Sequence, residues 1–216
     1  MGLVKRWLEL GLLFGVLPLV LSRGPRWAVL PTILAGGTLC LILLLLDPTF
    51  VRRRLWDAAG ARGGWKGLLL RTAAVWLGIF LFALAQRSPS GLFFFPRTHP
   101  GIWLGVVILY PIFSVYPQEL MYRTFFFHRY SGLFRRPGAL IAANAVLFGW
   151  AHILVHNVIA IILTTIGGLL FAWTYQRYRS TLLVAVEHAL YGDFVFSVGI
   201  GGMFVNGVRL LSKIVG

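Results

Sequence analysis

Residues 116–123 read Tyr-Pro-Gln-Glu-Leu-Met-Tyr-Arg and place a carboxylate and a guanidinium inside an otherwise apolar part of the chain. Glu119 and Arg123 are four residues apart, so both side chains lie on one face of a helix, where their charges attract each other. A charge at the centre of a bilayer costs about 2.5–3.5 kcal/mol on insertion scales. The pair therefore predicts either an ion pair that fixes helix packing or a site for chemistry.

The composition around this stretch is that of an integral membrane protein. Of the 216 residues, 58% are hydrophobic and only 12% are charged, whereas soluble domains have about 25% charged residues. A span needs about 20 apolar residues, so the length allows about seven helices. We therefore predict an all-α polytopic membrane fold, with spans at about 7–22, 27–46, 67–86, 102–130, 139–155, 158–175 and 181–200.

The formal net charge of +14 comes from short Lys and Arg clusters between the apolar runs. Such clusters are typical of topology signals and membrane-surface contacts, and we predict no nucleic-acid partner. The most basic linker, 47–66, also contains Gly and Trp and is expected to lie on the bilayer surface. More of the cationic residues outside the spans lie on the membrane side that carries the N-terminus, and we therefore place the N-terminus in the cytoplasm. We expect the membrane to be a bacterial inner membrane.

The ionisable groups within the spans are concentrated in the last four. They are Glu119, Arg123, His152, His156, Glu187, His188 and Asp193, accompanied by Asn144 and Asn157. Polar side chains inside a bilayer usually face one another or a wet cavity. We therefore divide the chain into N-terminal helices with a basic loop (1–100), a catalytic helical core (101–202) and a short interfacial tail (203–216).

Three kinds of chemistry suit this set of side chains. In a protease, Glu119 with His152 would activate water, and His188 with a nearby amide would hold the oxyanion. In a metal site, His152 and His156 would bind zinc from one helix face, completed by His188 or Glu119, although a His-Glu-x-x-His signature is absent. In a proton-coupled carrier the carboxylates would form a relay, but the chain shows no two-half repeat.

The order of three motifs resembles the CAAX-processing and bacteriocin-processing intramembrane proteases, called CPBP or type II CAAX prenyl endopeptidases. The motifs are Glu-x-x-x-Arg at 119–123, Phe-x-x-x-His at 148–152 and a later His at 188, and the resemblance covers about residues 110–201. It implies a glutamate-type membrane endopeptidase, often labelled a metalloendopeptidase, acting on a membrane-anchored or lipidated protein or peptide. By position it implies that Glu119, His152 and His188 are catalytic, with Arg123 supporting Glu119.

The sequence departs from the family pattern at two positions. Gln118 stands where the family has its first glutamate, and a carboxamide cannot act as a base. Gly192 stands where the third motif, His-x-x-x-Asn, has its asparagine. Candidates for the missing group are Asp193, Asn157 and Asn144, of which the carboxylate must be protonated to hold an oxyanion.

Two interpretations follow from these departures. In one, Glu119 serves as the base of an active peptidase. In the other, the chain is a catalytically silent relative that binds membrane proteins through the same cleft. Neither interpretation requires a cofactor, and zinc is the candidate if one is bound.

Overall fold

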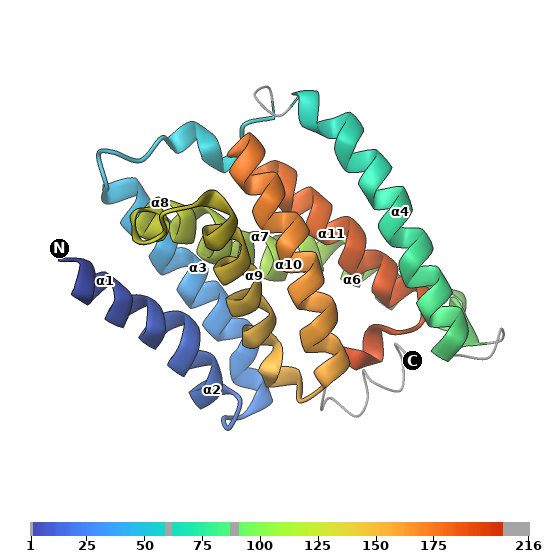
Figure 1. The fold of residues 1–216 in the computed structure, drawn as a ribbon. Coiled ribbons are helices and arrows are strands. Elements are labelled where there is room, and N and C mark those ends of the chain that lie inside the picture. Colours follow the sequence, from blue (N-terminus) through green and yellow to red (C-terminus); the bar gives the residue numbers. More distant parts are fainter. Residues whose placement is uncertain (1, 59–61, 87–90, 205–216) are drawn as a thin grey trace.

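The computed structural model describes residues 2–58, 62–86 and 91–204, and these residues form helices and connecting turns without a strand (Figure 1). Labels η denote 3-10 or π-helical turns. The elements, in chain order, are α1 (Leu3–Leu10), η1 (Gly11–Val16), α2 (Leu17–Leu21), η2 (Arg26–Ala28), α3 (Val29–Leu46), η3 (Arg52–Leu55), α4 (Arg62–Gln86), α5 (Phe94–Thr98), α6 (Pro100–Tyr110), η5 (Pro111–Val115), α7 (Tyr116–Glu119), η6 (Leu120–Phe125), α8 (Phe126–Tyr130), η7 (Ser131–Leu133), α9 (Pro137–Ala151), η8 (His152–Val155), α10 (Val158–Tyr178), α11 (Thr181–Val198) and η9 (Gly201–Met203).

Six of the described helical stretches are long and apolar enough to cross a membrane, which confirms the prediction of an all-α polytopic membrane protein. They are Val29–Leu46, Gly63–Gln86, Pro100–Leu133, Pro137–Val155, Val158–Tyr178 and Thr181–Val198. The first expected span, 7–22, is helical as α1, η1 and α2 but is not among the six. Lys5, Arg6 and Glu9 reduce the apolar character of that helix. Most of the expected interfacial tail, 205–216, lies outside the described residues.

The N-terminal helix is nevertheless fixed to the rest of the bundle by polar contacts. The Glu9 carboxylate accepts hydrogen bonds from Arg129 Nε at 3.0 Å and from the Tyr130 hydroxyl at 2.9 Å. Trp150 Nε1 donates to the Gly15 carbonyl at 2.8 Å. These bonds join the helix to α8 and α9, so the segment packs against the core instead of standing apart.

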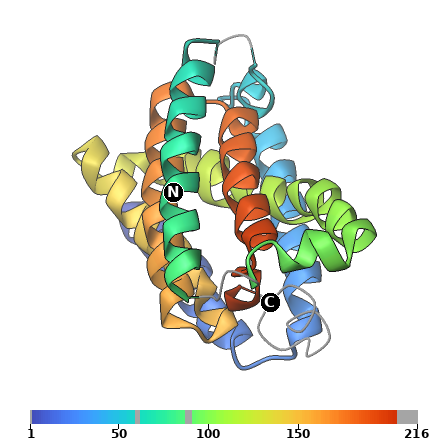
Figure 2. The same cartoon turned by 90° about the vertical axis from the view of Figure 1, so that its right-hand side faces the viewer.

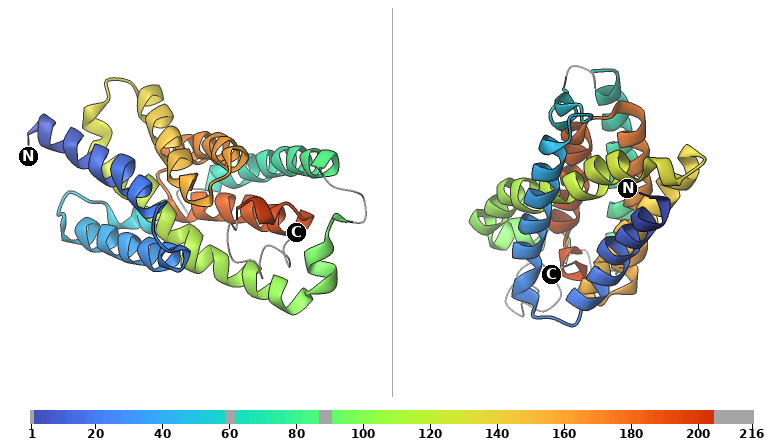
Figure 3. Two further views of the ribbon diagram at one scale, coloured as in Figure 1. Left: turned by 90° about the horizontal axis from the view of Figure 1, so that it is seen from below. Right: turned by 90° about the vertical axis from the view of Figure 1, so that its left-hand side faces the viewer.

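The longest helix runs without a break from α6 through α8. Pro111 and Pro117 are accommodated by two π-helical turns, η5 and η6, which flank the short α7. Figure 3 shows this helix running across α3, α10 and α11. Its 34 residues, Pro100–Leu133, would extend about 50 Å at about 1.5 Å per residue, against a hydrocarbon thickness of about 30 Å. A helix of this length fits such a membrane if it is strongly inclined to the membrane normal.

Helices α9 and α10 pack side by side as an antiparallel hairpin that depends on small residues. A Cβ atom on Gly149 would lie 1.8 Å from Thr165 Oγ1, and one on Gly168 would lie 3.2 Å from the Ala145 Cα. Close approach of two membrane helices through such residues is common. The contact brings Phe148 of α9 and Phe171 of α10 to the interior.

Helix α11 is the central element. It is 56% buried over its apolar stretch, whereas the other five candidate spans are 11–33% buried. The Ser180 side chain caps its first turn by accepting from the Leu183 amide at 3.2 Å. Helix α4 lies alongside it (Figure 2), and α7 crosses its other side. The polar residues Thr181, Glu187 and His188 of α11 are therefore buried inside the protein.

Candidate active site

Glu119, Arg123 and His188 meet in the interior, where the long helix crosses α11. His188 Nδ1 lies 2.8 Å from Glu119 Oε1, and Arg123 Nε lies 3.3 Å from Glu119 Oε2. Glu119 and Arg123 have no exposed surface, and His188 is 7% exposed. The pair expected from the four-residue spacing is present, and a histidine from a distant helix joins it.

Arg123 is held between aromatic rings. Its guanidinium carbon lies 4.3 Å from the ring centre of Phe148 and 5.4 Å from that of Phe171. None of its three guanidinium nitrogens makes a hydrogen bond to a described residue. Arg123 therefore acts on Glu119 through its charge, with the rings stabilising the cation.

The same two aromatic residues orient His188. The Phe171 ring stacks on the imidazole at a centroid distance of 4.7 Å, and Phe148 approaches edge-on at 5.6 Å. Because a carboxylate only accepts hydrogen bonds, the contact to Glu119 assigns the imidazole proton to Nδ1. The other nitrogen, Nε2, then carries the lone pair.

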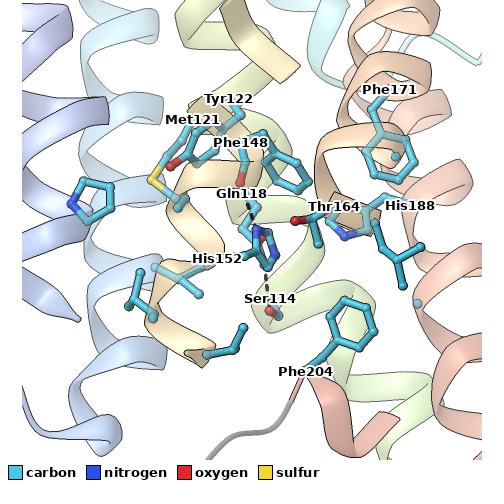
Figure 4. Close-up of a pocket in the computed structure, with 18 of the residues that line it drawn as sticks. Ser114, Gln118, Met121, Tyr122, Phe148, His152, Thr164, Phe171, His188 and Phe204 are labelled. Atoms are coloured by element: carbon cyan, nitrogen blue, oxygen red, sulfur yellow. Dashed lines mark hydrogen bonds between the residues drawn. The ribbon is translucent and has the colours of Figure 1, made fainter. Parts of the chain in front are cut away.

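A cavity of about 680 Å³ opens beside this cluster, enclosed by segments from every major helix. Its lining is mostly apolar. The polar side chains around it include Ser114, Gln118, His152, Thr164 and His188 (Figure 4). Tyr110 also lines the cavity. Glu119 is not among the lining residues, so the cavity meets the imidazole of His188 and not the carboxylate behind it.

Two further predicted residues, His152 and Gln118, also face the cavity. His152 directly follows the last residue of α9, and its Nδ1 lies 2.8 Å from the Phe148 carbonyl, to which it donates. Gln118 Nε2 donates to Ser114 Oγ at 2.9 Å. Within the described part of the chain no hydrogen bond joins His152 to Glu119. The structure thus pairs Glu119 with His188, whereas we had expected His152 as its partner.

The residues of the zinc alternative do not converge in the structure. Helix α9 ends at Ala151, and the exposed His156 has a left-handed φ of 53°, so His152 and His156 do not share a helix face. Among residues 2–58, 62–86 and 91–204 no group of three or more His, Cys, Asp or Glu is close enough to hold a metal ion. The donor set does not fit a zinc site, and no step below uses one.

The three candidates to replace the missing asparagine of the third motif are not among the residues that line the cavity. Asn157 caps α10, with its side-chain oxygen accepting from the Ile159 amide at 2.9 Å. Asn144 is buried and donates to the Tyr122 carbonyl. Asp193 has a buried Oδ1 without a hydrogen-bond partner among the described residues.

Glu187, the neighbour of His188, belongs to a separate polar cluster. Its carboxylate accepts from Arg71 Nε and from the Tyr191 hydroxyl, both at 3.0 Å. Arg71 also donates to Thr174 Oγ1 at 3.1 Å. These bonds join α4, α10 and α11, which indicates a structural role.

Sequence reasoning missed Tyr110, although a signal for it existed. Tyr110, Ser114 and Gln118 recur every four residues on one helix face, and all three line the cavity. A polar stripe of this period on an apolar helix indicates a wet face. The Tyr110 hydroxyl lies 3.2 Å from Nε2 of His188.

Fold and site together define a polytopic helical membrane protein with a buried Glu-Arg-His cluster beside an apolar cavity. Residues 100–192 match the family model described as "Type II CAAX prenyl endopeptidase Rce1-like". The match confirms the resemblance to the CPBP family, a family of membrane proteases, over a segment that contains all three motifs. No curated protein and no solved structure gave a match.

Proposed function

We propose that the protein is an intramembrane endopeptidase that hydrolyses a peptide bond of a membrane-associated protein with water activated at His188. The observation that carries this proposal is the position of His188, whose ring lines the cavity while its Nδ1 is bound to a buried carboxylate. A histidine held in this way is a base with a fixed tautomer, as in other acid–base sites.

In the proposed mechanism His188 Nε2 removes a proton from a water molecule. Glu119 accepts the Nδ1–H bond and stabilises the imidazolium that forms, and the positive charge of Arg123 lies 3.3 Å from the other carboxylate oxygen. The water oxygen forms a bond to the scissile carbonyl carbon, and the imidazolium later gives its proton to the departing amine. The direct base is thus His188, and Glu119 is its orienting partner, because Glu119 does not reach the cavity.

Two other cavity residues suit the remaining tasks. Because His152 donates through Nδ1 to Phe148, its Nε2 is an acceptor that can hold the second hydrogen of the water. Gln118 uses one N–H for Ser114 and has a second for a substrate carbonyl. Gln118 therefore supports catalysis as a donor and not as a base.

The size and lining of the cavity favour an apolar substrate segment. About 680 Å³ of mostly apolar space suits a hydrophobic peptide stretch or an attached lipid chain. We therefore keep a membrane-anchored or lipidated protein or peptide as the substrate class. A cytoplasmic N-terminus in a bacterial inner membrane stays a prediction.

The test compares membrane-protein termini by mass spectrometry in host cells that carry the wild-type chain or a variant at equal level. His188→Gln and Glu119→Gln should lose the specific new termini. His156→Gln is the matched control, because this exposed histidine lies outside the cluster, and it should keep them. Identical termini in wild type and His188→Gln would refute the proposal.

The departure at Gln118 favours one alternative, a silent relative that binds membrane proteins through the same cavity. Under this alternative the wild-type chain cleaves nothing. The variant Gln118→Glu would then gain cleavage, because it adds a carboxylate to the cavity lining. Wild-type cleavage that depends on His188 excludes the silent function.

A further inference from the structure

The ring of Tyr110 covers Gly192 on α11. A Cβ atom at position 192 would lie 2.5 Å from the Tyr110 hydroxyl oxygen and 2.6 Å from its Cε1. Both contacts are far shorter than real Cβ contacts, so any side chain at 192 would displace the tyrosine. Tyr110 thus occupies the space in which a longer residue at 192 would place its own side chain.

The Tyr110 hydroxyl contacts Nε2 of His188, the nitrogen that we propose as the base. Because Nδ1 of the imidazole donates to Glu119, Nε2 accepts the Tyr110 O–H at 3.2 Å. The Tyr110 ring stands edge-on to the imidazole, at 83°, and edge-on to Phe196, at 81°. These contacts hold the ring while the hydroxyl hydrogen can still rotate.

Nε2 has a single lone pair, so it accepts the Tyr110 O–H only until a water molecule takes that place. When the water gives its proton to Nε2, the Tyr110 hydrogen turns away from the imidazole, and the new Nε2–H stays directed toward the reacting atoms. Tyr110 also lines the cavity, so its O–H becomes a donor toward bound substrate at the moment when a carbonyl oxygen gains negative charge.

We infer that Tyr110 is a catalytic residue that donates a hydrogen bond to the oxyanion of the tetrahedral intermediate, and that Gly192 is required because it admits the tyrosine. This inference rests on the proposed peptidase function. The proton moves from water to His188 Nε2, and the hydroxide oxygen bonds to the carbonyl carbon of the scissile peptide bond. The π electron pair of the C=O bond then moves to the carbonyl oxygen, which becomes the oxyanion. On collapse the carbon–nitrogen bond breaks and the amine takes the proton from Nε2, so Tyr110 is never ionised.

The first test is Tyr110→Phe in purified protein, assayed with a peptide that contains the cleavage site found in cells. The variant keeps the ring over Gly192 and removes only the hydroxyl. Loss of an oxyanion donor costs about 10²- to 10³-fold in kcat, so we expect this fall with KM and Tm unchanged. The matched control is Tyr116→Phe on the same helix, whose hydroxyl donates to the Leu55 carbonyl at 3.0 Å and lies outside the cavity lining; its kcat should be unchanged.

A kcat of Tyr110→Phe within threefold of wild type overturns the inference, as does a change confined to KM. An inactive wild-type protein instead overturns the peptidase function itself, and the inference with it. A purely structural role for Tyr110 predicts a fall in Tm with little change in kcat, which would also overturn it.

The second test concerns Gly192. Gly192→Ala should lower both Tm and kcat, because the added methyl group displaces the tyrosine. Adding Tyr110→Ala removes the obstruction, so the double variant should lose less Tm than the sum of the losses of the two single variants, without regaining kcat. A Gly192→Ala variant with wild-type kcat would show that the close contact is not needed and would refute that part of the inference.

Discussion

Arg123→Met removes one charge of the buried pair and is expected to destabilise the protein strongly. The substitution keeps an unbranched side chain of similar length between Phe148 and Phe171 but leaves the Glu119 carboxylate without its cation. Breaking a buried ion pair by removing one partner typically costs about 3–5 kcal/mol. At the observed 3.3 Å and an effective dielectric constant of about 20, Coulomb attraction alone is about 5 kcal/mol, which agrees with that range.

The double variant Glu119→Gln/Arg123→Met separates stability from chemistry. It removes both charges and keeps an acceptor for His188 Nδ1, so most of the lost stability should return. Activity should stay absent, because a neutral amide does not stabilise the imidazolium. The coupling free energy from the cycle of two single variants and the double variant should be about 3 kcal/mol.

The assay is reversible unfolding by denaturant in detergent micelles, with cleavage measured on the same samples. Arg53→Met is the control, because Arg53 is 65% exposed and its ion pair with Asp57 is on the surface. Surface pairs contribute about 0–1 kcal/mol. Strictly additive losses at 119 and 123 would refute the account of Arg123 as the charge partner of Glu119, and so would an Arg123→Met variant as stable as the control.

Three further outcomes are expected. Gly149→Ala should cost about 1–3 kcal/mol of unfolding free energy, since its methyl group would meet Thr165 at 1.8 Å; an unchanged unfolding midpoint would contradict the close α9–α10 contact. Trp150→Phe should cost about 0.5–1.5 kcal/mol by loss of the bond to the Gly15 carbonyl, with cleavage retained, and a loss of cleavage would assign the tryptophan a role at the site. Incubation with 1,10-phenanthroline should leave the cleavage rate within about twofold, because the described ligands do not converge on a metal site; a rate restored only by added zinc would contradict this.

The sequence predicted the all-helical membrane fold and the Glu119–Arg123 pair because both depend on local information. Apolar runs of span length identify membrane helices, and a four-residue spacing fixes a shared face without reference to the rest of the chain. The location of the site in the last four expected spans followed from where costly polar groups occur. The structure places the cluster there, with contributions to the cavity from the earlier helices.

The partner of Glu119 could not be predicted in the same way. The choice between His152 and His188 depends on how α9 and α11 cross the long helix, and two π-helical turns alter its register. The zinc alternative required His152 and His156 on one helix face, and the sequence contained a local signal against this arrangement. Asn157 precedes an apolar run and is a strong N-cap, so a new helix begins after it and His156 cannot continue α9.

Under the proposed peptidase function, the apolar cavity also limits how the protein can choose among substrates. An apolar pocket distinguishes two chains that differ by one methylene group by about 1–3 kcal/mol at most when they arrive from water. An apolar substrate segment that enters the cavity from the lipid gains less binding free energy, because it leaves one hydrocarbon environment for another. Discrimination must therefore come from the few polar side chains in the lining, above all Gln118 and Ser114. Sequence preference should accordingly be strict for the polar atoms next to the scissile bond and loose for the hydrocarbon beyond them.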